Sequence, residues 1–422
     1  MVSRILQREA VKLSDVLKCR SCGSPSLTEV LSLGKTPLAN ALIAGADLAR
    51  EEKTYPLDLV FCDRCTLLQI TETISPDVLF SDYVYFSSFS ETMLRHSQAL
   101  VERLIPSEHL SPESLVIEVA SNDGYLLQFY RNSGIPVLGV EPAANIAEVA
   151  IANGIPTVCE FFGSEVATRL RGEKRVADVI HANNVLAHVP DLNGFVTGIE
   201  TLLADEGVAV IEAPYALDMI AGSEFDTIYH EHLCYFSLTA LDALFRRNGL
   251  QIHDVEQVPI HGGSLRILAS KSSSQRAVSQ AVVDLLSREE AWGVRQREPY
   301  LAFGAQVDEL KRTLAEMLSN LKGEGRRLAA YGASAKGSTL LNVFGIGRDT
   351  LDFVVDRSTV KQGRFTPGTH LPIRGPSALL EDEPDFVLLL TWNFADEILE
   401  QQAEFRSRGG KFIVPIPTPH II

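Results

Sequence analysis

The sequence predicts an α/β protein of several domains, and three observations carry this prediction. From residue 115 onward, short β-branched and aliphatic runs alternate with segments of helical spacing. Two Cys-x-x-Cys pairs precede this alternation, and a second, shorter alternation follows an amphipathic stretch that starts near residue 275. A chain of 422 residues is long enough for two or three such domains.

Charge and hydropathy exclude several classes of protein. The net charge of −16 and a pI near 5.1 argue against binding to a phosphate backbone. No apolar run reaches the roughly 18 residues of a membrane span, and no apolar signal region follows a charged start. We therefore expect a cytoplasmic protein, a monomer or weak homodimer, that binds neither nucleic acid nor membrane.

The N-terminal segment, residues 1–73, carries Cys19/Cys22 and Cys62/Cys65. Four thiolates at this spacing close a tetrahedral shell with no open position, so we predict a structural zinc ion. Free thiols or a redox pair are the alternatives. Cys159 and Cys234 have no partner in the pattern, and we expect them to pack in the core.

Residues 74–110 read as a helical connector with an aromatic cluster at its start, and residues 111–274 form the first α/β domain. We expect strands at 115–119, 137–141, 155–158, 177–182, 208–213, 251–257 and 264–270. Helices are expected near 124–132, 143–153, 162–171, 192–204 and 238–248. Five βα units followed by an antiparallel pair describe the seven-stranded sheet of class I, Rossmann-like methyltransferases.

The first βα turn predicts a nucleoside site. Glu118 to Gly124 supplies a strand end and a turn, and Glu141 ends the second strand, where a carboxylate can accept ribose hydroxyls. A single glycine beside a carboxylate suits a pyrophosphate poorly, so we expect the cationic nucleoside S-adenosylmethionine. The alternative is an ordinary βα turn without a ligand. The predicted donor-binding residues are Glu118, Ala120, Asn122, Gly124, Glu141, Pro142, Asn183 and Asn184.

Tyr229-His-Glu-His232 follows the fifth strand and is the densest group of reactive side chains. A histidine beside a carboxylate and a phenol suits general acid/base chemistry. A metal site formed by His230, Glu231 and His232, or a solvated loop, are the alternatives.

The pattern over residues 275–322 predicts a long amphipathic helix that separates the domains. A second Rossmann-like domain is predicted over residues 323–422. Its strands are expected at 327–331, 351–356, 385–390 and 411–416, and its helices at 336–344 and 393–408. The turn Gly332 to Gly337 opens a helix, which suits a diphosphate group of the substrate. The residues expected to bind it are Ser334, Lys336, Asp356 and Lys361. A dehydrogenase-like relic that binds nothing is the alternative.

Six motifs taken in order resemble the nucleotide-sugar C-methyltransferases of deoxysugar assembly. They are the cysteine pairs, Glu118-Val-Ala-Ser-Asn-Asp-Gly124, Asn183-Asn-Val-Leu-Ala-His-Val-Pro190, Tyr229-His-Glu-His232, His261-Gly-Gly-Ser-Leu-Arg266 and Gly332-Ala-Ser-Ala-Lys-Gly337. The resemblance implies a small N-terminal zinc domain, a donor-binding middle domain and a Rossmann-like C-terminal domain. It also implies methylation of a thymidine-diphosphate (TDP) 4-keto-6-deoxy sugar at carbon 3.

The same resemblance implies residue roles. His232 would remove the carbon-3 proton, with Glu231 and Tyr229 orienting it or holding the sugar. Tyr83 and His188 match the remaining active-site tyrosine and histidine, and His261 and Arg266 fall among the substrate contacts. Two other hypotheses remain open: a methyltransferase that is also a nicotinamide-dependent ketoreductase, and a non-catalytic zinc scaffold.

Overall fold

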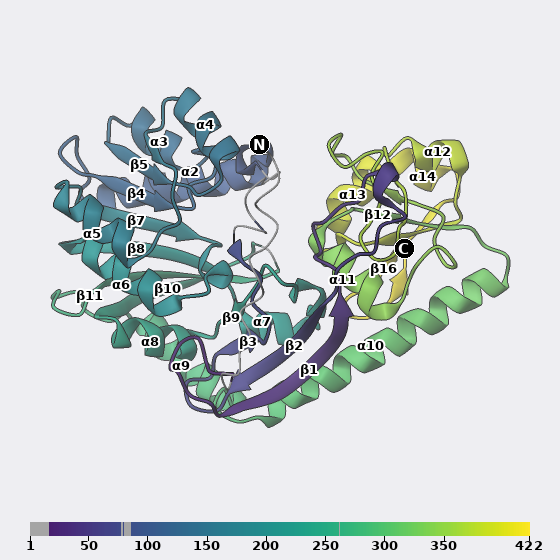
Figure 1. Ribbon diagram of the computed structural model, residues 1–422, viewed down its shortest axis with the longest axis horizontal. Helices are drawn as coiled ribbons and strands as arrows, with labels where there is room; N and C mark the ends of the chain where they lie inside the picture. The colour runs from purple at the N-terminus through teal and green to yellow at the C-terminus, as the bar shows by residue number, and fades with distance from the viewer. Residues whose placement is uncertain (1–16, 77–78, 80–85, 261) are drawn as a thin grey trace, which may run out of the picture.

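The computed structural model describes residues 17–76, 79, 86–260 and 262–422. Two α/β domains lie side by side, and a long hairpin of β1 and β2 together with helix α10 runs beneath both of them (Figure 1). Contacts of α10 and α11 with β1 fix this arrangement.

The N-terminal sheet contains a strand from the middle domain. Its order is β1-β2-β3-β9, and all its neighbours are antiparallel. The strands span Leu27–Thr36, Tyr55–Cys62, Leu68–Ile70 and Cys234–Tyr235. Since β9 follows Tyr229–His232 directly, the expected zinc domain and the candidate catalytic segment share one sheet.

The middle domain is the predicted seven-stranded sheet, in the order β10-β11-β8-β7-β4-β5-β6. The strands are β4 (Val116–Val119), β5 (Val137–Val140), β6 (Thr157–Val158), β7 (Ala177–Asn183), β8 (Leu203–Pro214), β10 (Leu250–Val258) and β11 (Ser264–Lys271). Strands β10 and β11 form the antiparallel pair that the sequence predicts, and β11 is also antiparallel to β8. Every residue of β4 and β5 is buried, which explains their unbroken aliphatic runs.

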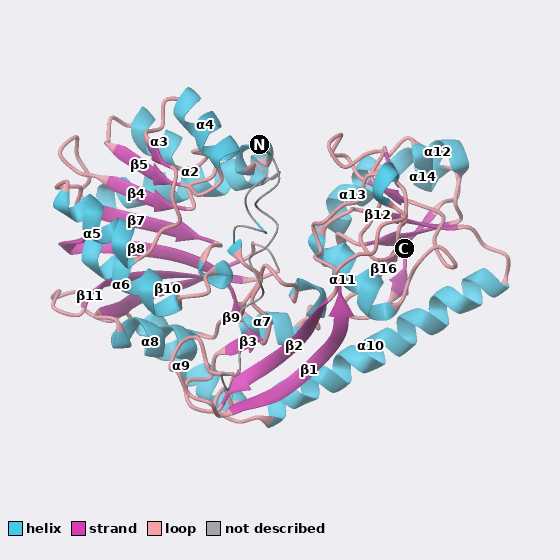
Figure 2. Ribbon diagram, in the orientation of Figure 1, coloured by secondary structure: helices cyan, strands magenta, loops and turns pink. Residues whose placement is uncertain are grey.

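Helices cover both faces of this sheet (Figure 2). They are α2 (Glu91–Ser107), α3 (Leu127–Asn132), α4 (Ala144–Ala152), α5 (Ser164–Gly172), α6 (Leu192–Leu202) and α8 (Leu238–Arg247), whereas α7 (Ala216–Ala221) lies beside β9. The expected connector helix is thus α2. None of the helices in the described part of the chain is long and apolar enough to span a membrane.

The expectation of one long helix over 275–322 is wrong. Two helices, α9 (Gln280–Trp292) and α10 (Glu298–Gly323), are separated at Gly293, which adopts φ = 90°. A left-handed glycine ends α9 in the usual way for a helix C-terminus, so this residue starts a turn instead of continuing the helix.

The C-terminal domain is the expected second Rossmann-like sheet, in the order β14-β13-β12-β15-β16-β17. Its strands are β12 (Leu328–Tyr331), β13 (Val354–Val355), β14 (Ile373–Arg374), β15 (Phe386–Leu389), β16 (Lys411–Val414) and β17 (His420–Ile421). Its helices are α11 (Ala335–Phe344), α12 (Ala378–Asp382), α13 (Ala395–Gln401) and α14 (Ala403–Ser407). The helix expected at 393–408 is therefore two shorter helices, preceded by the 3-10 turn η5 (Trp392–Phe394).

Candidate active site

The four cysteines predicted to hold zinc come together. Their sulfur atoms all lie within 4.8 Å of one another, with Cys19 3.5 Å from Cys65 and Cys22 3.6 Å from Cys62. A zinc ion with four thiolates at ~2.3 Å needs sulfurs about 3.8 Å apart, so this donor set fits a tetrahedral structural ion. Cys234 is buried as expected, whereas Cys159 is exposed and the core prediction for it is wrong.

The described residues offer this one candidate metal site. Within the described residues, the four cysteines are the only group of three or more His, Cys, Asp or Glu side chains whose ligand atoms lie this close. The metal alternative for His230, Glu231 and His232 therefore has no geometric support in this structure.

The donor loop after β4 has an unusual backbone. Ala120, Asn122 and Gly124 have φ of 54°, 50° and 82°. Its shape is held by Glu141, whose two carboxylate oxygens accept the N–H of Asn122 at 3.0 Å and of Ala143 at 2.9 Å. A Cβ at Gly124 would lie 2.7 Å from Ile155 Cγ1, so packing and the positive φ, rather than close approach of a ligand, account for this glycine.

Buried oxygens without partners gather at this edge of the sheet. In the part of the chain that the structure describes, they are Glu118 Oε2, Ser121 Oγ, Asp123 Oδ1, Asn183 Oδ1 and Asn184 Oδ1. Buried polar atoms are nearly always hydrogen-bonded, so these acceptors mark a place where a ligand supplies donors. The hydroxyl and amino groups of S-adenosylmethionine supply such donors, and its sulfonium adds a positive charge.

Two donor-site carboxyls are shifted toward their neutral forms. Burial, followed by repulsion from Glu141 and Asp123, raises the pKa of Glu118 well above its usual value. Burial also raises the pKa of Glu141, although its backbone hydrogen bonds oppose the shift. A cationic ligand would relieve this penalty. Pro142 follows Glu141, and its carbonyl lies 3.7 Å from Cys159 Sγ.

The segment Tyr229–His232 divides into two pairs of side chains. His232 Nδ1 lies 2.9 Å from the carbonyl of Thr227, and Tyr229 Oη lies 2.9 Å from His232 Nε2. The carbonyl can only accept, so Nδ1 carries the proton and Nε2 is the basic nitrogen. The Tyr229 hydroxyl therefore contacts the basic nitrogen of His232.

Glu231 and His230 face the N-terminal domain. Asn40 Nδ2 donates to Glu231 Oε1 at 2.7 Å, and His230 Nε2 lies 3.0 Å from the carbonyl of Pro56. Burial raises the pKa of Glu231 to about 6. The Glu231 carboxylate thus pairs with Asn40 of the N-terminal domain, a contact that sequence reasoning missed.

His188 meets His232 from the neighbouring strand end. It closes the 3-10 turn η3 (Leu186–His188) after β7, and its ring packs edge-on against His232 with centroids 4.8 Å apart. Burial lowers its pKa to about 4, opposed by hydrogen bonds with the backbone of Glu231 and Asn184. Asn183 and Asn184 lie at the predicted methyl-donor site, and His188 of the same motif packs against His232. This motif therefore connects the predicted methyl-donor site with His232.

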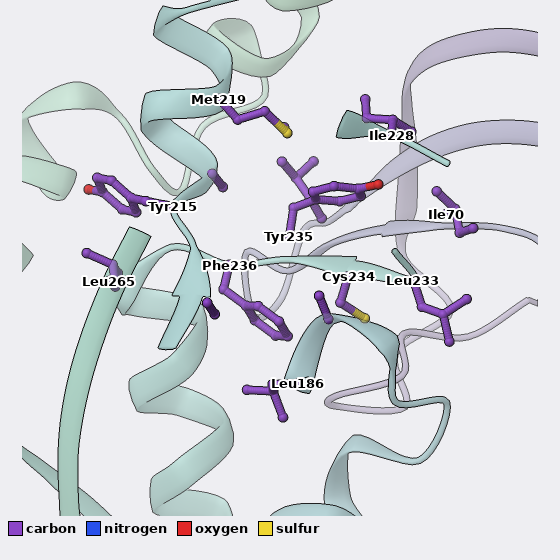
Figure 3. Packing of buried hydrophobic residues seen from close by; sticks show 14 of the residues in the cluster. Ile70, Leu186, Tyr215, Met219, Ile228, Leu233, Cys234, Tyr235, Phe236 and Leu265 are labelled. Atoms are coloured by element: carbon purple, nitrogen blue, oxygen red, sulfur yellow. The ribbon is translucent and has the colours of Figure 1, made fainter. Parts of the chain in front are cut away.

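Apolar packing holds this segment in place. Leu233, Cys234, Tyr235 and Phe236 lie among side chains from the neighbouring strand ends and helix α7, including Met219 (Figure 3). Tyr235 Oη donates to the carbonyls of Thr227 at 3.3 Å and His232 at 3.1 Å. The backbone around the basic histidine is therefore fixed on both sides.

The predicted substrate residues are not gathered in one place. Arg266 is 6% exposed, and its guanidinium contacts Glu212 at 2.7 Å, His96 at 2.9 Å and Glu256 at 3.0 Å. These partners occupy it within the protein. Tyr83 and His261 lie outside the described residues.

The glycine turn of the C-terminal domain also has internal partners. Ser334 Oγ accepts the N–H of Gly337 at 3.0 Å, and Asp356 accepts the N–H of Ala333 at 2.8 Å. Lys361 Nζ lies 2.8 Å from the carbonyl of Ala333, with Asp356 at 3.6 Å.

Lys336 points toward the middle domain. Its Nζ lies 3.4 Å from Glu224 Oε2 in the loop before Tyr229, and 5.3 Å from the centroid of the Trp392 ring. A diphosphate bound to Lys336 would have to compete with this ion pair. Acidic residues shortly before Tyr229 are visible in the sequence, but their partner across the domains is not.

The sheet order, the donor loop and the cysteine cluster define a zinc-containing methyltransferase that uses S-adenosylmethionine. Family profiles match the chain in the same order: a putative zinc binding domain over residues 19–80, a methyltransferase domain over 89–255 and a C-methyltransferase C-terminal domain over 259–417. The C-methyltransferase NovU of Streptomyces niveus is 36% identical over 405 residues, which cover 96% of each chain. The chain belongs to this C-methyltransferase family, which confirms the resemblance of its motifs.

Two solved structures that resemble this chain each cover less than half of it. The magnesium protoporphyrin IX methyltransferase of Synechocystis PCC 6803 with bound SAH is 15% identical, covers 42% of this chain and 83% of its own, and has a TM-score of 0.34. The PH0226 protein of Pyrococcus horikoshii OT3 is 12% identical, covers 44% and 95%, and scores 0.37. Scores this low support no conclusion about the present chain.

Proposed function

We propose that this C-methyltransferase transfers the methyl group of S-adenosylmethionine to carbon 3 of a TDP-4-keto-6-deoxy sugar. The supporting observation is the Tyr229–His232 pair, whose basic nitrogen is 2.9 Å from the phenol. The pair lies beside His188, on the turn that follows the donor edge of the sheet. A ketone acidifies the adjacent C–H bond, so one positioned base is enough to start this reaction.

In the proposed step, His232 Nε2 takes the proton from carbon 3 and the bonding electrons move into an enolate. The donor supplies an electrophilic methyl group, which forms the new C–C bond as S-adenosylhomocysteine leaves. The Thr227 carbonyl orients the imidazole. The Tyr229 O–H, which donates to Nε2 in the structure, turns to the enolate oxygen as Nε2 takes the proton, and there it stabilises the developing negative charge. His188, whose pKa is low, stays neutral and packs against the base.

Mass spectrometry of the sugar nucleotide tests this proposal against the alternatives. Incubation with S-adenosylmethionine should add one methyl group, and reduced nicotinamide should change nothing further. A product that also gains two hydrogens with nicotinamide would indicate a ketoreductase, and no product at all would favour the zinc scaffold.

A further inference from the structure

A network of titratable side chains lies between helix α2 and the middle-domain sheet. Its members are His96 and Arg103 of α2, Glu212 of β8, Glu256 of β10 and Arg266 of β11. Arg266 donates through Nε to Glu212 at 2.7 Å and through Nη1 to Glu256 at 3.0 Å. At the centre of the network, the side chains of Glu212 and Arg266 are 0% and 7% exposed. Burying such charges costs free energy that an apolar core avoids, so stability alone does not explain the network.

His96 joins this network with a single nitrogen atom. Its Nε2 lies 2.9 Å and 3.0 Å from the two carboxylate oxygens of Glu212, and 2.9 Å from Arg266 Nη2. A carboxylate only accepts and a guanidinium only donates, whereas one ring nitrogen carries either a proton or a lone pair. Only one of the two contacts is therefore a hydrogen bond at any time. A side chain that offers both a donor and an acceptor at this place would satisfy both partners.

Glu212 connects His96 to one side of the predicted methyl-donor site. It lies near the carboxyl end of β8, in register with Asn183 of β7, and its backbone carbonyl accepts the N–H of Asn184 at 2.8 Å. Asn184 has φ = 56°, a sparsely populated conformation that the surrounding contacts must hold. The contact of His96 with Glu212 therefore ties α2 to the strand end that carries two predicted donor-binding residues.

The start of α2 reaches the other side of the same site. The 3-10 turn η2 (Ser87–Phe89) directly precedes α2. Its backbone N–H groups at Ser87 and Ser88 donate to Asn122 Oδ1 at 2.8 Å and to Asp123 Oδ2 at 3.4 Å. Both acceptors belong to the loop that follows β4. One helix thus contacts the donor loop through η2 and the end of β8 through the network.

We propose that His96 is a positioning residue for methyl-donor binding: it docks α2 on Glu212 and thereby holds η2 against the donor loop. His96 acts through Asn122 and Asp123 and need not touch the donor. Loss of the imidazole leaves Glu212 paired with Arg266, so the buried ion pair of the sheet persists while the docking of α2 weakens. The proposal does not depend on which sugar is methylated.

The first test measures the binding of S-adenosylmethionine to the full chain by titration calorimetry. His96→Leu should weaken binding roughly 2- to 30-fold, the range for a substitution that acts through a packed network. The Ser87 and Ser88 amides should exchange hydrogen faster, because η2 is held less firmly. Arg95→Leu is the matched control on the same helix and should change neither quantity, since its side chain is 72% exposed. In turnover, His96→Leu should raise KM for the donor with little change in kcat.

The second test replaces His96 with glutamine. Its carboxamide offers Glu212 a donor and Arg266 an acceptor together, so His96→Gln should bind the donor at least as tightly as the parent and keep the slow exchange of η2. Weaker binding than the parent in His96→Gln would overturn the proposal, and this comparison decides the question even if His96→Leu does not fold. Parental affinity in His96→Leu, or weaker binding without faster exchange at Ser87 and Ser88, would also overturn it.

Discussion

Glu118 and Glu141 lie where the methyl donor is predicted to bind, beside Asp123, and burial raises the pKa of both carboxyls. Keeping such carboxyls ionised without a counter-charge costs free energy, and a sulfonium ion supplies that charge. The sequence placed these acids at the strand ends correctly. It could not show that Glu141 spends both oxygens on the backbone of the loop, because this depends on the turn that the chain makes between Ala120 and Gly124.

Donor binding should therefore release protons. The free site holds protons on its raised carboxyls, a cation favours their ionised forms, and affinity should rise with pH until those carboxyls ionise without the donor. Titration calorimetry in two buffers of different ionisation enthalpy measures the release. S-adenosylhomocysteine lacks the sulfonium charge and should release fewer protons, and a heat independent of buffer for both ligands would contradict this account.

The contact between Asn40 and Glu231 could not be predicted from the sequence motifs. The motif suggests that Glu231 orients His232, yet the Glu231 carboxylate accepts a hydrogen bond from the Asn40 amide of the N-terminal domain. Asn40 lies far from Tyr229–His232 in the sequence and follows no spacing rule, so only the folded chain brings the two together.

Among the elements, β9 has the most consequence for function. It pairs Cys234 with Gln69 and Tyr235 with Leu68 of β3, immediately after the candidate catalytic segment. The turn between Cys19 and Cys22 also contacts the middle domain. There the side chains of Asn193 and Arg247 donate to the carbonyl of Ser21 at 3.0 and 2.9 Å. The metal site thus supports the segment that carries His232.

Loss of zinc should consequently reduce turnover as well as order. Cys62→Ser leaves three thiolates that cannot close the shell, and we expect faster hydrogen exchange of the Leu233–Tyr235 amides together with a lower kcat. Cys159→Ser is the control, because that thiol is exposed and outside the cluster. Metal analysis of protein purified without chelator should find about one zinc per chain, and less than about half would reject the site.

The strands that were predicted correctly are those whose burial on both faces requires an unbroken run of aliphatic residues. The strands at 116–119 and 137–140 were expected within a residue or two, because both faces of a parallel sheet demand aliphatic side chains. The two-residue strand β9 carries no such pattern and exists through its partner β3. The break between α9 and α10 depends on Gly293, which has a left-handed φ. The helical periodicity of the sequence gives no sign of this φ.

At the scale of the whole molecule, the C-terminal domain is tied to the middle domain by apolar and charged contacts. Phe225 and Phe344 stack with centroids 4.6 Å apart, beside the Lys336–Glu224 ion pair and the Trp392–Asp226 hydrogen bond. The N-terminal hairpin adds Glu52, which accepts the N–H of Gly368 at 3.0 Å. Helix α11, expected from its glycine turn to hold phosphate, is thus also a structural contact.

Phe344→Ala should weaken this junction. Phe344 is 7% exposed, and emptying such a site costs roughly 3–5 kcal/mol of unfolding free energy. Scanning calorimetry should show the C-terminal domain melting before the middle domain. The exposed Phe161→Ala should shift stability by no more than about 0.5 kcal/mol. A single, unshifted transition in Phe344→Ala would mean that the ring contributes little to holding the domains together.

The central claim is that His232 removes the carbon-3 proton, and solvent exchange isolates that step. The test uses deuterated water with S-adenosylhomocysteine in place of the donor. The parent should replace the hydrogen on carbon 3 of the keto-sugar with deuterium, because forming the enolate does not require the methyl group. His232→Asn should bind both ligands yet exchange about 10²- to 10⁴-fold more slowly, the usual contribution of a positioned base. If His232→Asn exchanges at the parental rate, His232 is not the base, and His188 or Tyr83 becomes the candidate. If His232→Asn exchanges slowly and Tyr229→Phe shows no exchange at all, the phenol of Tyr229 is the base.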